Sequence, residues 1–477
     1  MKKSILFLLI VFSSNAVLSQ EFWDLRKCIN HAIENNINIQ SQLLTNELNT
    51  ENAKQTNYNA LPNLNSNVSH GYNWGQRIDP FTNQFASERV RNNNLNVSTN
   101  VVLFNGLRIG KLKEQAKLAV TAGEFDLGET ANDISVAVSQ SFLSNLLSKE
   151  QLKIAQGQRD ITLQQIDRMT KLVNGGQEPK ANLYELEAQL ATDDLGIVRI
   201  ENDILLSRVS LINLLQLKGA ESESFDIVAP DNLSDDIVIP AVSANELYQS
   251  AIANQPEIQA AMIREDQTTI DIDVAKSDGL PSLSLFGSIG SGYSGANSEG
   301  VGETNSAFIP VGQVGIGGET VFTLQEQESF SDFQTRSFGD QLDQNFNQSL
   351  GFNLSIPIFN GFASKTNVSR AKINLELARL NTERVKNTLA NETQQAYANA
   401  IAALNQYKST EKSVEVFERN FDNAQKRFEN GLINSTEFNA AKTQMQNQQF
   451  QMISSKYEYI FRMKIMELYQ GKKIILE

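Results

Sequence analysis

Apolar residues recur at helical spacing along two long stretches of the chain, residues 106–176 and 361–431. Neither stretch contains proline, and both are rich in Ala, Leu, Glu, Gln and Lys, so each predicts one nearly unbroken helix. With a rise of about 1.5 Å per residue, such a helix is roughly 105 Å long. The pattern therefore predicts an elongated architecture rather than an ordinary globular domain.

Both long stretches end at a glycine turn, Asn174-Gly175-Gly176 in the first and Asn430-Gly431 in the second. The residues after each turn again place apolar side chains three and four positions apart, as coiled-coil helices do. We therefore expect two helical hairpins, 106–217 and 361–470.

Two polar residues, Asp193 and Ser207, interrupt the apolar positions of the first return helix. A polar residue held in the core of packed helices favours one register over others. We interpret both residues in this way. The alternative is that they make the packing less stable, so that the helical hairpins can separate.

Four shorter stretches alternate between apolar and polar residues, which predicts strands of about ten residues, the length that a tilted strand needs to cross a bilayer. The strands form two expected β-hairpins, at about 62–104 and about 281–359, and the second contains a long polar loop at 294–346. Their apolar sides include Leu64, Val68, Tyr72, Leu95, Val97, Val101, Leu285, Ile289, Leu350, Phe352 and Leu354.

The two halves of the chain correspond to each other. An offset of 255 superimposes Gly106 on Gly361 and Gly176 on Gly431, and an offset of 219 superimposes Leu61-Pro62 on Leu280-Pro281. The longer polar loop of the second β-hairpin accounts for the change of offset. The chain is therefore an internal tandem repeat.

The N-terminus has the pattern of a secretory signal peptide, because Lys2-Lys3 precede a short apolar run and small residues lead to Ser19. The run is shorter than the roughly 20 residues that cross a bilayer. The expected organisation is a signal peptide at 1–19, a first structural repeat at 20–218 that begins with a helix at 24–58, an acidic linker at 219–243, and a second structural repeat at 244–477 that begins with a helix at 245–278.

Composition excludes several classes of function. A net charge of −14 argues against a nucleic-acid surface, which requires clustered Lys and Arg. Two histidines and one cysteine leave little for a metal site, and we expect Cys28 to be a buried, inert thiol. No catalytic set, cofactor motif or phosphate loop is visible, so we expect no enzyme and no cofactor.

Four strands of membrane length cannot close a barrel within one chain, and an open edge in lipid leaves unpaired backbone groups. The strands must then come from several chains. Three copies supply 12 strands, which is a common order for a closed barrel with an aqueous lumen.

These features together resemble the TolC-like family of outer-membrane efflux and secretion channels, over nearly the whole mature chain. The resemblance is carried by the tandem repeat and by four motifs, the strand exits 102–106 and 356–361 and the tips 171–183 and 427–438. It implies an α+β membrane protein, a homotrimer in which a long-helix α-barrel continues from a transmembrane β-barrel with four strands per protomer. It also implies a Gram-negative outer membrane with a long periplasmic extension, and docking on a periplasmic adaptor that belongs to an inner-membrane transporter of RND or ABC type.

The resemblance assigns roles to particular residues. Members carry an acidic residue six positions after each tip glycine, where it narrows the periplasmic entrance; here these positions hold Glu437 and Asn182, and a further position that is acidic in some members is Ala440. Glu437 also fits the simpler role of a residue that opens a helix near its positive end. The implied adaptor-docking tips are Gly175, Gly176, Arg427, Gly431 and Leu432, and the strand–helix elbows are Asn105, Gly106, Asn360 and Gly361.

The implied function is a passive exit duct, gated at its helical tips, for a tripartite efflux pump or a type I secretion system. The sequence does not distinguish an efflux pump from a type I secretion system, and it does not identify the exported substrate. The alternative is a secreted coiled-coil structural or adhesive surface protein, which would explain the helices and the signal peptide but not the four amphipathic strands.

Overall fold

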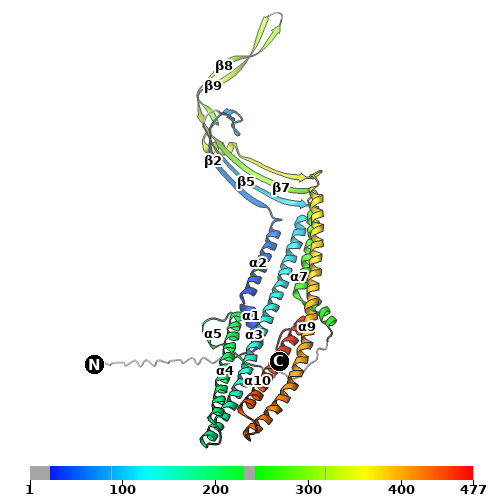
Figure 1. The fold of residues 1–477 in the computed structure, drawn as a ribbon. Coiled ribbons are helices and arrows are strands. Elements are labelled where there is room, and N and C mark those ends of the chain that lie inside the picture. The colour runs from blue at the N-terminus through cyan, green and yellow to red at the C-terminus, as the bar shows by residue number, and fades with distance from the viewer. Residues whose placement is uncertain (1–21, 87–88, 230–241, 317–318, 476–477) are drawn as a thin grey trace, which may run out of the picture. The chain divides into compact units, whose positions relative to one another are not determined.

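The computed structural model describes residues 22–86, 89–229, 242–316 and 319–475 (Figure 1). The predicted signal peptide lies outside the described residues. The chain divides into two compact units. Unit 1 comprises Met1–Thr50, Lys117–Thr268 and Asn374–Glu477, and unit 2 comprises Glu51–Ala116 and Thr269–Ile373.

Two long helices of 67 residues each dominate the secondary structure, α3 (Arg108–Asn174) and α9 (Ala363–Glu429). Each is followed by a return helix, α4 (Lys180–Leu215) after α3 and α10 (Ser435–Tyr469) after α9. In unit 1 the two helical hairpins lie side by side (Figure 1). None of the helices in the described ranges has both the length and the apolar character that a bilayer crossing requires.

The helices expected at 24–58 and 245–278 are each broken in two, which corrects the prediction. The first is α1 (Leu25–Asn35) and α2 (Ile37–Tyr58), and the second is α6 (Ala244–Asn254) and α7 (Pro256–Ser277). At the first break the Asn36 amide donates to the Leu214 carbonyl at 2.9 Å, and at the second the Gln255 amide donates to the Leu468 carbonyl at 2.9 Å. These tertiary hydrogen bonds hold both break residues in extended conformations.

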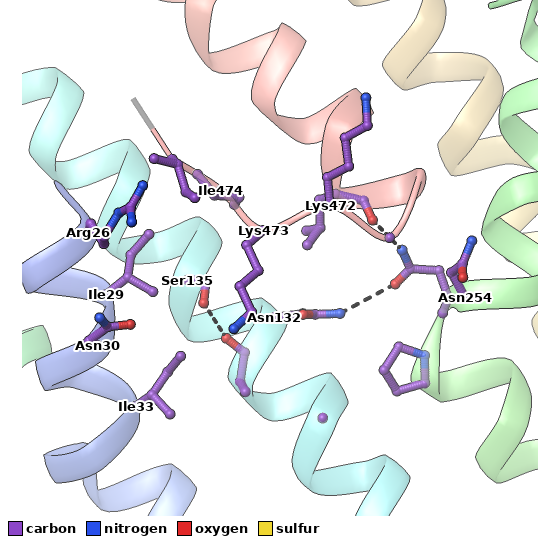
Figure 2. Close-up of a pocket in the computed structure, with 17 residues that line it drawn as sticks. Arg26, Ile29, Asn30, Ile33, Asn132, Ser135, Asn254, Lys472, Lys473 and Ile474 are labelled. Carbon is purple, nitrogen blue, oxygen red and sulfur yellow. Dashed lines mark hydrogen bonds between the residues drawn. The ribbon is translucent and has the colours of Figure 1, made fainter. Parts of the chain in front are cut away.

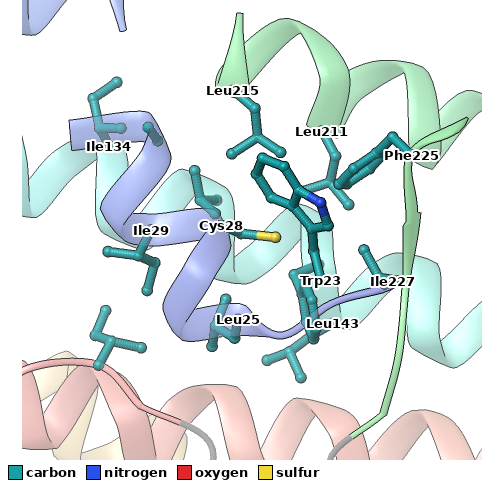
Figure 3. Packing of buried hydrophobic residues seen from close by; sticks show 14 of the residues in the cluster. Trp23, Leu25, Cys28, Ile29, Ile134, Leu143, Leu211, Leu215, Phe225 and Ile227 are labelled. Atoms are coloured by element: carbon teal, nitrogen blue, oxygen red, sulfur yellow. The ribbon is translucent and has the colours of Figure 1, made fainter. Parts of the chain in front are cut away.

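The largest hydrophobic core of unit 1 surrounds α1 (Figure 3). Trp23 packs against Leu211, Leu215 and Phe225, and the fully buried Cys28 lies beside it. Burial, with a smaller contribution from Asp24, raises the pKa of the Cys28 thiol to about 12. The expected burial of Cys28 is confirmed, and its inertness stays a prediction.

Part of the predicted acidic linker forms regular structure and contributes to this core. It contains α5 (Ala220–Ser224) and β6 (Asp226–Ile227), and β6 pairs in parallel with β1 (Phe22–Trp23). Phe225 and Ile227 are buried in the core around Trp23. The acidic residues concealed this short apolar alternation, and residues 230–241 lie outside the described part of the chain.

A four-stranded antiparallel sheet forms the centre of unit 2, in the order β10-β7-β5-β2. Its strands are β2 (Asn63–Asn73), β5 (Val90–Asn105), β7 (Ser282–Ser294) and β10 (Asn347–Ser355). The register gathers the apolar residues on one face: Leu64, Val68, Tyr72, Leu95, Val97, Val101, Leu285, Ile289, Leu350, Phe352 and Leu354. Asn and Ser dominate the opposite face, which includes Asn65, Asn67, Ser69, Asn94, Asn96, Ser98, Ser284, Ser288, Ser349 and Asn353.

The prediction of a long polar loop at 294–346 is also corrected, because this segment contains two strands and a short helix. A β-hairpin of β8 (Ser298–Ile316) and β9 (Glu319–Thr335) extends beyond the sheet, and the short helix α8 (Phe338–Gln344) follows (Figure 1). The first sheet connection holds a smaller pair, β3 (Arg77–Ile78) and β4 (Phe85–Ala86).

Candidate functional site at the helical tips

Both helical hairpins turn through the same backbone arrangement. Gly176 and Gly431 have φ angles of +71° and +69°, a conformation in which a side chain is strained. The N–H groups of Gly176 and Gln177 donate to carbonyls three and five residues earlier, at 3.0 and 2.9 Å, and those of Gly431 and Leu432 do the same at 3.1 and 2.8 Å. This pattern closes the last turn of a helix, and its positive φ favours glycine at both tips.

The two tips share one hydrophobic core in unit 1. Phe438 packs between Phe421 and Phe428, with ring centroids 5.7 and 4.7 Å apart. Further members come from α3, α4 and α10: Met169, Leu186, Ala441 and Met445. The second hairpin therefore packs directly on the first near the turns.

Charged residues of the first hairpin hold both helix ends of the second tip. The Arg168 guanidinium donates to the carbonyls of Phe428, at 3.5 Å, and Glu429 at the end of α9. The Glu185 carboxylate accepts hydrogen bonds from the hydroxyls of Ser435 and Thr436 at the start of α10. A cation at a helix C-terminus and an anion at an N-terminus both complement the helix dipole.

A buried ion pair joins the hairpins further from the turns. The Lys442 ammonium of α10 lies 2.5 Å from the Asp193 carboxylate of α4, and their side chains are only 1% and 5% exposed. Thr162 of α3 donates to the same carboxylate oxygen at 2.6 Å, and Gln189 donates to the other oxygen at 2.8 Å. Burial lowers the pKa of Lys442, and Asp193 offsets part of that effect.

The sequence pattern does not identify Arg168, Glu185, Thr162 or Lys442 as residues of the tips. Each finds its partner on the other hairpin or on another helix, at separations of up to 280 positions in sequence. The interruption of the apolar pattern at Asp193 was the only local signal.

The two candidate gate residues occupy different environments. Glu437 is exposed, and its backbone N–H donates to the Asn434 side chain at 2.9 Å, so it lies in the capped first turn of α10. Asn182 is half-buried and donates to Glu178 at 2.8 Å. In the described part of the chain, no hydrogen bond or ion pair joins Glu437 to Asn182.

The candidate docking residues lie at the turns themselves. The Gly175 N–H donates to the Lys171 carbonyl at 3.0 Å, as part of the same closing turn. Arg427 is exposed, and the Leu432 side chain is 69% exposed. Leu432 is therefore an exposed apolar side chain that does not contribute to the core at the tips.

The four elbow residues lie in unit 2: Asn105, Gly106, Asn360 and Gly361. Each glycine and the residue after it, Leu107 or Phe362, has a φ between +62° and +66°. A Cβ on Gly106 would lie 2.8 Å from Cβ of Leu280, so no side chain fits there. The asparagines extend to the following helix, where Asn105 accepts from the Ile109 N–H at 3.3 Å and Asn360 donates to the Ser364 hydroxyl at 2.6 Å.

A cluster of four acidic side chains in unit 1 lines a pocket between α3, α7, α9 and α10. Burial first, and then the carboxylates of Glu392, Glu129 and Asp133, raise the pKa of Glu257 to about 7. Burial also raises the pKa values of Glu129, Asp133 and Tyr469. Across the described residues, no group of three or more His, Cys, Asp or Glu side chains has the arrangement of a metal site.

Comparison with known proteins places the chain in a family. Among solved structures, the CmeC outer membrane channel of Campylobacter jejuni is 15% identical, with a TM-score of 0.70 over 95% of this chain and 86% of that one. The outer membrane protein VceC from Vibrio cholerae is 13% identical, with a TM-score of 0.70 over 94% of this chain and 96% of that one. The MtrE outer membrane channel of Neisseria gonorrhoeae, in its open state, is 15% identical, with a TM-score of 0.62 over 95% of this chain and 90% of that one.

These structural likenesses establish the fold, and no curated protein sequence matches the chain. The sequence profile of the family described as outer membrane efflux protein matches residues 28–216 and 247–460, which is most of the chain. The TolC-like resemblance is thereby confirmed, and the chain belongs to the outer membrane efflux protein family.

Proposed function

We propose that the chain is one protomer of a homotrimeric channel in the outer membrane of a Gram-negative bacterium, the passive exit duct of a tripartite efflux pump or type I secretion system. The four-stranded sheet of unit 2 carries this proposal. One face exposes apolar residues such as Leu64, Val68, Leu350 and Phe352, and the other is lined by Asn and Ser. A membrane barrel needs this division between a lipid face and a wet lumen.

The edges of the sheet support an assembly of several chains. β2 and β10 are the two ends of the strand order, so each has one partner within the chain. An unpaired strand edge in lipid costs several kcal/mol for each unsatisfied backbone group. Three chains with four strands each would close a barrel of 12 strands and remove every edge.

A matched pair of substitutions on β2 tests the barrel. Val68 lies on the apolar face and its neighbour Asn67 on the polar face. Val68→Arg should reduce the yield of heat-modifiable trimer in detergent, because Arg on a lipid face costs up to about 2–4 kcal/mol near the bilayer centre. Asn67→Arg should leave the trimer intact and alter single-channel conductance. Equal tolerance of both substitutions, or a water-soluble monomer in wild type, would refute the barrel.

The tips are proposed to dock on a periplasmic adaptor. Leu432 supports this assignment, because a 69% exposed leucine at a helical turn is available to a partner. Leu432→Ser should weaken co-purification with the adaptor while the trimer persists. Leu205→Ser is a matched control, since Leu205 is also exposed but lies on α4 far along the chain from either turn.

Glu437 is proposed to narrow the entrance as one member of an acidic ring from three protomers. Its exposure in the first turn of α10 supports this role. Glu437→Gln should reduce the cation selectivity of single channels in planar bilayers, whereas Glu411→Gln, an exposed position of α9, should not. If the cation selectivity is unchanged in Glu437→Gln, Glu437 acts only as an acidic residue in the first turn of α10, where it complements the helix dipole.

The alternative of a secreted coiled-coil surface protein is not supported by the comparisons, since the matching family consists of outer membrane efflux proteins. Efflux and type I secretion are separated by the transporter that co-purifies with the adaptor. An RND-type transporter would indicate efflux, and an ABC transporter with a secreted protein would indicate secretion.

A further inference from the structure

A cationic pocket in unit 1 is the strongest candidate for an additional site (Figure 2). It has a volume of about 480 Å³, within the range of small-molecule sites. Its walls come from α1, α3, the α6–α7 break and the segment that follows α10. Three of the lining residues are cationic, Arg26, Lys472 and Lys473, and no carboxylate lines the pocket among the described residues.

The segment after α10 is held firmly over the pocket. Gly471 has a φ of +79°, and a Cβ there would lie 2.9 Å from Cγ of Asn254, so glycine allows the chain to turn close to the α6–α7 break. Three residues further on, Ile474 is buried in the core around Trp23. These two anchor points fix the direction of the residues between them.

The two lysines between the anchors point in different directions. Lys473 extends into the pocket toward Asn132 and Ser135, whereas Lys472 extends away from them (Figure 2). Within the described ranges, neither Lys473 nor Arg26 forms an ion pair with a carboxylate. The positive charges of Lys473 and Arg26 are therefore available to an anionic ligand.

The remaining wall of the pocket is apolar and amide-lined. Ile29, Ile33 and Leu468 provide apolar surface, and the Asn30 and Asn132 amides lie beside it (Figure 2). The acidic pocket of Glu129, Asp133, Glu257 and Glu392 lies beyond a wall that both pockets share: Asn132, Gln255, Pro256 and Leu468.

From this arrangement we infer that the pocket binds a small amphipathic anion, with a carboxylate or phosphate head on Lys473 and Arg26 and a short apolar tail on Ile29 and Ile33. A charge-assisted hydrogen bond from Lys473 or Arg26 adds more than a neutral bond, which favours an ionised head. Burying a tail of a few methylenes strengthens binding roughly fourfold for each CH₂. A free inorganic ion lacks the tail, and a neutral alcohol lacks the charge.

Calorimetric titration of the full-length trimer in amphipol tests this site with four probes. Hexyl phosphate and hexanoate should bind saturably, and the tighter of the two identifies the head group. Inorganic phosphate and hexanol should bind at least tenfold more weakly, because each lacks one half of the ligand. Absence of saturable binding by both anions, or equally tight binding of inorganic phosphate alone, overturns the inference.

Three variants locate the binding. Lys473→Gln and Arg26→Gln should each weaken the better anion by about tenfold, as expected for loss of one charge-assisted hydrogen bond. Lys412→Gln is the matched control and should bind as wild type does, because Lys412 is an exposed lysine of α9 that does not line the pocket. All three positions are exposed, so the trimers should fold alike. If wild type and Lys473→Gln bind the better anion with equal affinity, the anion site is refuted. This outcome does not depend on the proposed channel function.

Discussion

Removal of the Lys442 ammonium should loosen the contact between the two helical hairpins. Lys442→Met keeps most of the side-chain volume and leaves the Asp193 carboxylate, which is 5% exposed, with the hydrogen bonds from Thr162 and Gln189 but without its ion-pair partner. Breaking a buried ion pair by removing one partner costs about 3–5 kcal/mol. With about 1.4 kcal/mol for each factor of ten, local opening should become roughly 10²- to 5 × 10³-fold more frequent.

Hydrogen exchange followed by mass spectrometry measures this opening in the assembled protein. Peptides that cover Thr162, Asp193 and Lys442 should lose protection, whereas peptides from the sheet of unit 2 should not. The double variant Lys442→Met/Asp193→Leu should recover most of the loss, because replacing both members of a buried pair with apolar residues is often neutral or stabilising.

An exposed ion pair is the matched control. Lys426 and Asp422 of α9 are 2.6 Å apart, with side chains 68% and 63% exposed. Lys426→Met should change protection by less than about 1 kcal/mol. If Lys442→Met has no larger effect than Lys426→Met, or if the double variant is as open as the single one, burial of the charge pair is not what holds the hairpins together.

Three further predictions concern single positions. Gly176→Ala and Gly431→Ala should each destabilise their tip by about 1–2 kcal/mol, the cost of placing Ala in the left-handed conformation, seen as faster exchange at the turn. Cys28 should not react with maleimide at about pH 8 until the protein is unfolded, since its pKa is raised to about 12. The pKa of Glu257 is raised from 4.5 to about 7, so its contribution to stability is present below about pH 4.5 and is lost as the pH rises through about 7. Between about pH 5 and 8 the Tm should therefore fall less in Glu257→Gln than in wild type, and a control at exposed Glu187→Gln should fall as wild type does.

The features that the sequence predicted correctly depend on local pattern. The long helices α3 and α9 follow from apolar spacing without proline, and their ends follow from the glycine turns at Gly176 and Gly431. Glycine in these turns is favoured by local backbone geometry, so these turns can be predicted without tertiary contacts.

The features that the sequence did not predict depend on contacts between distant segments. The helix breaks at Asn36 and Gln255 exist because their side chains bind carbonyls of other helices, which local propensity does not report. From the sequence, Arg168 and Glu185 are predicted to be ordinary surface charges. Their roles depend on the ends of α9 and α10, which pack beside them. The cationic pocket is assembled from segments that begin at Arg26 and end near Ile475.

The two core polar residues that the sequence singled out perform separate structural tasks. Ser207 of α4 accepts a hydrogen bond of 2.8 Å from Asn145 of α3, a contact within the first hairpin. Asp193 of the same helix binds Lys442 of α10, a contact between the hairpins. Since a slip of one helical turn moves a side chain by about 5.4 Å, neither contact survives a change of register. Asn145 and Ser207 therefore align α3 with α4, and Asp193 and Lys442 then align the second hairpin on the first.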